Sequence, residues 1–200
     1  MASSGKRVHT RRVDGPRDSE SSSVGEPSGG SHPQTDTSRD ADVHAFLIAD
    51  VRGYTAFTQE QGDEDAARLA GRFAQVTRSV VEDHRGHVLE LSGDEALVVF
   101  GSPRSAIRGA VALQQRFVEE TVADPSLPLT VGIGLDAGEA VPVESGFRGG
   151  AINRAARLCA MAGPAEVLST REVVHLAGRT EGVTSVDRGP ARASTPRPEA

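Results

Sequence analysis

The sequence predicts an α+β sandwich, in which an antiparallel or mixed sheet carries helices on one face. Strand-like and helix-like stretches follow one another in the order strand, helix, two strands, helix, two strands, helix. Residues 63–85 have a clear helical period, and residues 86–100 place a polar tip between two apolar runs. Together these features indicate a mainly antiparallel sheet.

The ordered part of the chain is expected to begin at Val43. Residues 43–50 (VHAFLIAD) form an apolar run that is typical of a buried strand. Gly53 then permits a sharp turn into a short helix. A longer helix is predicted from Asp63 or Glu64. Its apolar residues recur at spacings of four, three and four and are Leu69, Phe73, Val76 and Val80.

Residues 86–100 (GHVLELSGDEALVVF) predict a β-hairpin, because a Gly- and Asp-containing tip joins two apolar runs. Pro103 is expected to begin the next helix. The later elements are predicted as a strand at 128–135, its antiparallel partner at 137–143, a Gly-rich turn at 146–150, a helix at 151–161, a strand at 165–169 and a helix at 171–176.

Composition limits the classes of function. The chain of 200 residues carries a net charge of -6, which argues against nucleic-acid binding because phosphates attract a basic face. No apolar run is long enough to span a bilayer and no secretory signal is visible, so we expect a cytoplasmic protein with no membrane partner. Residues 1–42 lack Leu, Ile, Phe, Tyr and Trp and are predicted to be a disordered tail.

Two acidic residues stand where a metal site would need them. Asp50 ends the first predicted strand, and Asp94 lies in the hairpin tip. Carboxylates held at strand ends suit a divalent cation that carries a phosphate group. The sequence therefore predicts a metal site that includes both aspartates.

Three segments, FLIADVRGYTAFTQ, GHVLELSGDEALVVF and GGAINRAARL, together resemble the catalytic domain of class III nucleotide cyclases, with an actinobacterial-type composition. The resemblance covers about residues 43–180. It implies a ferredoxin-like, palm-type sandwich that works as a homodimer, with each active site across the interface. The catalytic domain is accordingly expected at 43–188, followed by a disordered or truncated end at 189–200.

The resemblance also implies roles for individual residues. Asp50, Asp94 and the backbone of Val51 would bind two Mg²⁺ or Mn²⁺ ions per site, which would carry the triphosphate of ATP or GTP. Asn153 would orient the ribose and Arg157 would stabilise the transition state, both acting on nucleotide held by the partner subunit's aspartates. The backbone N–H groups of Gly53, Tyr54 and Thr55 would bind phosphate.

The residues expected to recognise the base do not all indicate the same nucleotide. Glu90 matches the first base-reading position and leans towards guanine, although it could also accept from the adenine amino group. Gly146 occupies the second position and offers no side chain. Arg148 is a candidate donor to guanine O6. Like Asn153 and Arg157, Glu90 is expected to serve the site of the other subunit.

One departure leaves a second function open. The family has a phosphate-binding lysine about forty residues after the catalytic asparagine, whereas residues 189–200 contain none and Arg192 is the nearest cation. A catalytically impaired, nucleotide-binding or dimerisation module is therefore the alternative to an active enzyme. A remote alternative is a diguanylate cyclase, whose GGDEF signature the tip resembles; Arg52 stands where that family has a second aspartate.

Overall fold

The computed structural model describes residues 9–13, 43–144 and 146–189. The elements are β1 (His9–Val13), β2 (Val43–Val51), α1 (Tyr54–Gln61), α2 (Asp63–Asp83), β3 (Gly86–Ser92), β4 (Glu95–Phe100), α3 (Pro103–Ala123), β5 (Val131–Glu139), β6 (Val141–Val143), β7 (Gly146–Arg148), α4 (Gly150–Met161), β8 (Val167–Thr170), α5 (Arg171–Ala177) and β9 (Thr184–Asp187).

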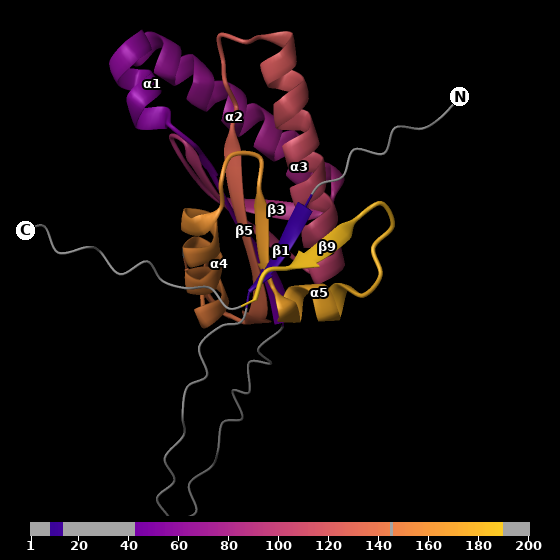
Figure 1. Cartoon of the computed structure of the whole chain (residues 1–200). Coiled ribbons are helices and arrows are strands. Elements are labelled where there is room, and N and C mark those ends of the chain that lie inside the picture. Colours follow the sequence, from indigo (N-terminus) through magenta and orange to yellow (C-terminus); the bar gives the residue numbers. More distant parts are fainter. Residues whose placement is uncertain (1–8, 14–42, 145, 190–200) are drawn as a thin grey trace, which may run out of the picture.

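The main sheet has the strand order β3-β4-β2-β5-β8-β1-β9. Strands β3, β5, β1 and β9 of this sheet are labelled in Figure 1. The β3–β4, β4–β2 and β2–β5 pairs are antiparallel, whereas β5–β8, β8–β1 and β1–β9 are parallel. Strands β3-β4-β2-β5-β8 form the mostly antiparallel part and carry the hairpin with its polar tip. The predicted α+β class is confirmed.

Helices cover both faces of this sheet. Alternate residues of β2 and β5 pack with α2, α3 and α5 in one core, and we call this side the α2–α3 face. Phe46 and Ile48 of β2 point the other way and pack with Ala151, Ala155 and Cys159 of α4; this side is the α4 face. The sequence predicted helices on one face only. Helices α2, α3 and α5 share one face, but α4 lies on the opposite face. Because β2 is buried on both sides, its sequence is continuously apolar.

The predicted partner strand at 137–143 is wrong. Strand β5 continues to Glu139 because its whole length, from Val131, pairs with β2. Only Val141–Val143 forms a further strand, and it pairs with β7 in a separate two-stranded sheet. Residues 136–138 belong to the alternation of β5, in which one face is apolar and the other is made of small residues and an aspartate.

The α4 face of β5 is shaped for close approach. Its residues there are Gly132, Gly134, Asp136 and Gly138, while Val131, Ile133, Leu135 and Ala137 enter the opposite core. A Cβ atom at Gly134 would overlap the backbone of α4 at Ala155 and Cys159. The inward positions of α4 are occupied by alanines, so the backbones of β5 and α4 lie close together without large side chains between them.

The structure describes His9–Val13 of the predicted N-terminal tail, and these residues form β1 between β8 and β9. The sequence did not indicate this strand. The other residues of 1–42, and those from 190 onwards, lie outside the described part, so the predicted tail and C-terminal end remain predictions there. Within the described residues, no helix has the length and apolarity needed to cross a bilayer.

We predict that Gly134→Ala lowers the free energy of unfolding by about 3 kcal/mol, because the added methyl group meets rigid backbone rather than a movable side chain. Gly71→Ala is the control: a Cβ there meets nothing within 4 Å, and within α2 alanine should stabilise by about 0.5–1 kcal/mol. Urea denaturation measures both. Equal stability of Gly134→Ala and the wild type would contradict the close backbone contact.

Candidate active site

Two elements bring Asp50 and Asp94 together. The backbone N–H of Val51, at the end of β2, donates to the Asp94 carbonyl at 3.0 Å. Gly93 has a φ of 59°, the left-handed value that a two-residue hairpin turn requires at its first position. Glu95 begins β4 directly opposite Asp50. The tip of the β3–β4 hairpin is thus fixed against the end of β2, and the predicted pair of aspartates shares one corner of the sheet.

This corner concentrates negative charge. Burial raises the pKa of Asp50, Arg52 partly lowers it, and Asp94 adds to the rise. Burial also raises the pKa of Glu95, with further contributions from the charges of Asp50, Asp94 and Glu90. Four carboxylates therefore lie near one another, and a hard divalent cation with oxygen ligands would relieve their repulsion. The donor set fits the implied Mg²⁺ or Mn²⁺, although the described residues contain no group of three acidic, His or Cys side chains arranged as a ready metal site.

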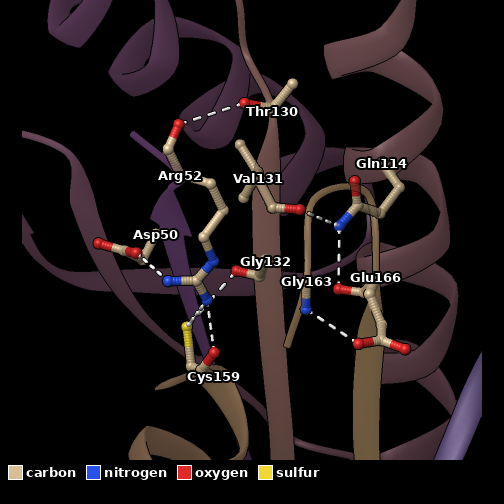
Figure 2. A network of polar contacts seen from close by, with 9 residues as sticks. All are labelled: Asp50, Arg52, Gln114, Thr130, Val131, Gly132, Cys159, Gly163 and Glu166. Atoms are coloured by element: carbon tan, nitrogen blue, oxygen red, sulfur yellow. Dashed lines mark hydrogen bonds and ion pairs between the residues drawn. The ribbon is translucent and has the colours of Figure 1, made fainter. Parts of the chain in front are cut away.

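Arg52 lies within this corner and was missed as a site residue by the sequence reasoning. Its Nη1 donates to Asp50 Oδ2, and its Nη2 donates to the carbonyl of Cys159 on α4 (Figure 2). The Cys159 thiol contacts the Gly132 carbonyl at 3.4 Å, and burial raises its pKa to about 11, so the thiol stays protonated at neutral pH. The signal in the sequence was the position of an arginine two residues after a predicted metal ligand.

The predicted phosphate-binding segment forms the start of α1. Gly53 caps the helix with a φ of 80°, and its carbonyl accepts from the Phe57 amide at 2.9 Å. The N–H groups of the first turn, which include Tyr54 and Thr55, have no carbonyl partners within the helix. The Tyr54 hydroxyl donates to the Ala66 carbonyl at 3.2 Å, so this ring braces α1 against α2. The backbone, rather than the tyrosine, would therefore contact an anion.

Asn153 and Arg157 both lie on the exposed side of α4. Asn153 lines a pocket of about 270 Å³ together with Phe147, Arg148 and Gly149. The start of α4 is remote from the corner with the aspartates, whereas its last turn reaches that corner, where Cys159 contacts Arg52 and the Gly132 carbonyl. Gly138, beside the start of α4, pairs with a position on β2 six residues before Asp50, which is about 20 Å of strand. Within one chain, Asn153 is therefore remote from the predicted metal ligands, whereas Arg157 lies nearer to their corner but on the exposed side of the helix.

The three base-recognition residues are divided in the same way. A β-bulge shifts the β3–β4 register between Val88 and Glu90 and places Glu90 opposite Leu97, on the α4 face. Glu90 is therefore near the carboxylate corner of its own chain, and its expected role in the site of the other subunit stays a prediction. Gly146, with a φ of 129°, begins β7, and Arg148 ends it beside Asn153. The bulge could not be read from the alternation of the sequence.

A second ion pair ties α4 to the sheet. Asp136 is 1 % exposed, and its Oδ2 accepts from Arg154 Nε at 2.6 Å while its Oδ1 accepts from the Thr170 hydroxyl at 2.6 Å. Burial is the largest influence on the Asp136 carboxyl and raises its pKa despite these partners. Arg154 follows Asn153 directly, so this ion pair fixes the helix turn that carries the predicted ribose contact.

Comparison with known proteins finds relatives of this chain. The chain is 34% identical over 151 residues to the putative adenylate cyclase 3 of Rhizobium meliloti, and 30% identical over 153 residues to an uncharacterized protein of Mycobacterium tuberculosis. These alignments cover 72% and 70% of this chain but 25% and 29% of the relatives, so the chain spans little more than a quarter of their length. No protein-family model matches.

Solved structures give the same result for the fold. The guanylyl cyclase Cya2 superposes with a TM-score of 0.62 at 23% identity, covering 68% of this chain and 79% of that one. An adenylate/guanylate cyclase/hydrolase from Silicibacter pomeroyi superposes with a TM-score of 0.55 at 25% identity, covering 66% and 76%. The fold is therefore that of an adenylyl/guanylyl cyclase catalytic domain. The chain belongs to the class III nucleotide cyclase family, as its motifs indicated.

We predict that Asp136→Asn removes a pH dependence of stability. Because the pKa of Asp136 is raised in the folded protein, the native state holds this proton more tightly than the unfolded state does. The wild type should therefore gain stability relative to Asp136→Asn as the pH falls from neutral towards 4, and lose it as the pH rises. Urea denaturation across this range tests the sign. Asp65→Asn, which removes an exposed partner of Arg68, is the control; a relative gain with rising pH would contradict the prediction.

Proposed function

We propose that this chain is a nucleotide cyclase that converts ATP or GTP into the 3′,5′-cyclic nucleotide and pyrophosphate for intracellular signalling. The observation that carries the proposal is the joining of Asp50 and Asp94 across the Val51–Asp94 hydrogen bond, at a corner crowded with carboxylates. Family membership supports the reaction class. The choice of substrate, the metal chemistry and the dimer are parts of the proposal.

The aspartates and the start of α1 would bind the polyphosphate end of the substrate. Asp50, Asp94 and the backbone of Val51 would hold two Mg²⁺ or Mn²⁺ ions. When bound, the ions would lower the pKa of the ribose 3′-hydroxyl and neutralise the phosphates. The free amides after Gly53 lie just beyond the end of β2, where the β- and γ-phosphates could accept hydrogen bonds from them.

A second copy of the chain would complete each site. Asn153 lies in the first half of α4, whereas the last turn of this helix reaches the Asp50 corner through Cys159 and Arg52. Asn153 and Arg157 both lie on the exposed side of α4, so a single chain would hold two incomplete half-sites. An antiparallel pair of chains would place the α4 of one beside the carboxylate corner of the other. Asn153 would then orient the ribose, and Arg157 would stabilise the charge that develops on the α-phosphate. Two equivalent sites would result.

Base selection would depend on Glu90 and Arg148. Glu90 is exposed on the α4 face, where its carboxylate could accept from N1–H and the amino group of guanine. Arg148 lines the pocket that includes Asn153 and could donate to guanine O6. Gly146 offers no side chain that could read the base, so Glu90 would carry most of the preference for GTP.

A catalytically impaired, nucleotide-binding module is the second candidate. The observation that favours it is the absence of lysine from residues 189–200. Without that cation, the proposed site would rely on the α1 amides and Arg157 for phosphate charge. Binding of nucleotide with no turnover would distinguish this module from the enzyme.

We predict formation of cyclic nucleotide from GTP or ATP when the full chain is incubated with Mn²⁺. Asp94→Asn should lower kcat at least about 100-fold, because a carboxamide cannot replace a charged metal ligand. Asp83→Asn, at the exposed end of α2, is the matched control and should retain activity. Nucleotide binding by the wild type without any product under Mn²⁺ or Mg²⁺ would support the impaired module instead.

Mixing two inactive variants tests the composite site. Asp94→Asn and Arg157→Ala should each be inactive alone. In a mixed dimer, one site combines the intact aspartates of one chain with the intact α4 of the other, so mixing should restore up to one quarter of the wild-type rate per chain if association is random. Failure of mixing to restore any activity, with dimers verified by light scattering, would contradict sites shared between chains.

We predict that Glu90→Lys shifts preference from GTP towards ATP. Lysine can donate to adenine N1 but repels the N1–H donor of guanine, and a charged hydrogen bond is worth about 1.5–3 kcal/mol, or about 10–100-fold. The ratio of kcat/KM for GTP to that for ATP should fall by this factor. Glu119→Lys, an exposed change on α3, is the control. An unchanged ratio would show that Glu90 does not contact the base.

A further inference from the structure

The guanidinium of Arg52 occupies a gap that β5 leaves for it. A Cβ atom at Gly132 would overlap this guanidinium, so only glycine leaves room for the side chain between the sheet and α4. The backbone of Arg52 is fixed as well. Its amide donates to the Thr130 carbonyl at 2.7 Å, and its carbonyl accepts from the Thr130 hydroxyl at 3.3 Å. Both ends of the residue are therefore held in place.

The two terminal nitrogens of Arg52 bind different parts of the molecule, as Figure 2 shows. Nη1 donates to one carboxylate oxygen of Asp50, and Nη2 donates to the carbonyl of Cys159 in the last turn of α4. The carbonyl end of a helix is its negative pole, which favours a cation there. Nε is buried without a partner among the described residues, so the polar contacts of the guanidinium are those of Nη1 and Nη2.

We propose that Arg52 is a positioning residue for the metal site, which holds Asp50 against α4 through one carboxylate oxygen and leaves the other oxygen to bind the metal. This inference rests on the proposed function. The planar guanidinium suits the task because it can donate in two directions at once, which the single ammonium of lysine cannot do with the same geometry. Partners of this kind orient metal-binding side chains and typically contribute 10–100-fold to metal affinity.

Arg52 also connects two half-sites within one chain. Asp50 belongs to one proposed active site, whereas α4 carries Asn153 and Arg157 for the other. The Cys159 carbonyl that holds the guanidinium is six residues after Asn153 and two after Arg157 on the same helix. A shift of α4 when the partner's nucleotide binds would therefore reach Asp50 through one side chain.

Binding of Mn²⁺ to the full chain, measured by calorimetry with a non-cleavable methylene analogue of GTP or ATP, tests the positioning role. Arg52→Gln and Gly132→Ala should each weaken Mn²⁺ binding about 10-fold or more. The double variant should bind no more weakly than the weaker single variant, since both changes remove the same contact. Arg52→Lys should remain weak, because it keeps the charge but not the two-directional geometry.

Two controls match these changes. Arg72→Gln removes a partly buried arginine that pairs with Glu120 between α2 and α3. Gly138→Ala adds a methyl group on the same face of β5, where it would meet Ala151 at 3.4 Å. Both should bind Mn²⁺ like the wild type. Circular dichroism and the melting temperature show for every variant whether the protein is folded.

The outcomes separate the positioning role from its alternatives. If folded Arg52→Gln and Gly132→Ala bind Mn²⁺ as tightly as the wild type or more tightly, Arg52 is only a counter-ion and the inference is overturned. Full affinity in Arg52→Lys would show that charge alone matters and would overturn it equally. If the wild type binds Mn²⁺ neither alone nor with either analogue, the proposed function fails, and the inference fails with it.

The mixed dimer shows which half-site depends on Arg52. One working site forms from an Arg157→Ala chain, which supplies the aspartates, and an Asp94→Asn chain, which supplies α4. Arg52→Gln should lower the restored activity more when it is placed in the first chain than in the second. Equal loss from both positions, or a larger loss from the second, would contradict the assignment of Arg52 to Asp50.

Discussion

The close contact between α4 and β5 is the constraint on which the candidate site depends. Glycines at 132 and 134 remove the side chains that would keep the helix away, and the alanines of α4 face them. Because the backbones meet directly, the helix has little freedom to slide, and its exposed residues have defined positions. The same gap that admits α4 also admits the Arg52 guanidinium beside Gly132. Packing of small residues thus determines where the charged residues lie.

Charged residues on the α4 face then form two groups, one around Asp136 inside the sheet and one around Asp50 at its corner. Asp136, deep in the sheet, is satisfied by Arg154 and Thr170 and serves to anchor the helix. At the carboxylate corner, Asp50 pairs with one arginine, and burial, together with the neighbouring carboxylates, raises the pKa of both Asp50 and Glu95. One buried carboxylate is therefore structural, whereas the corner around Asp50 retains charge that a cation could neutralise.

The separation of the half-sites explains why the proposed enzyme would need two chains. A chain whose metal ligands lie at one corner of the sheet, and whose Asn153 and Arg157 lie on the exposed side of α4, would be incomplete alone, and association with a second copy would complete both sites. Any change in how the two chains associate would alter activity without altering the residues that carry out the reaction. Arg52 adds a path within each chain, from the last turn of α4 to Asp50, by which the two sites could sense one another.

The sequence alone determined the α+β class, the hairpin with Asp94 at its tip, the helix with Asn153 and Arg157, and the family. These follow from local periodicity, turn residues and short motifs, which act over a few residues. It did not reveal the bulge at Leu89, the continuation of β5 to Glu139, the placement of α4 on the opposite face, or the roles of Arg52 and Asp136. Those features depend on contacts between residues far apart in the chain, and only the tertiary structure could decide them, because a glycine or an arginine has no visible partner until the helix is packed on the sheet.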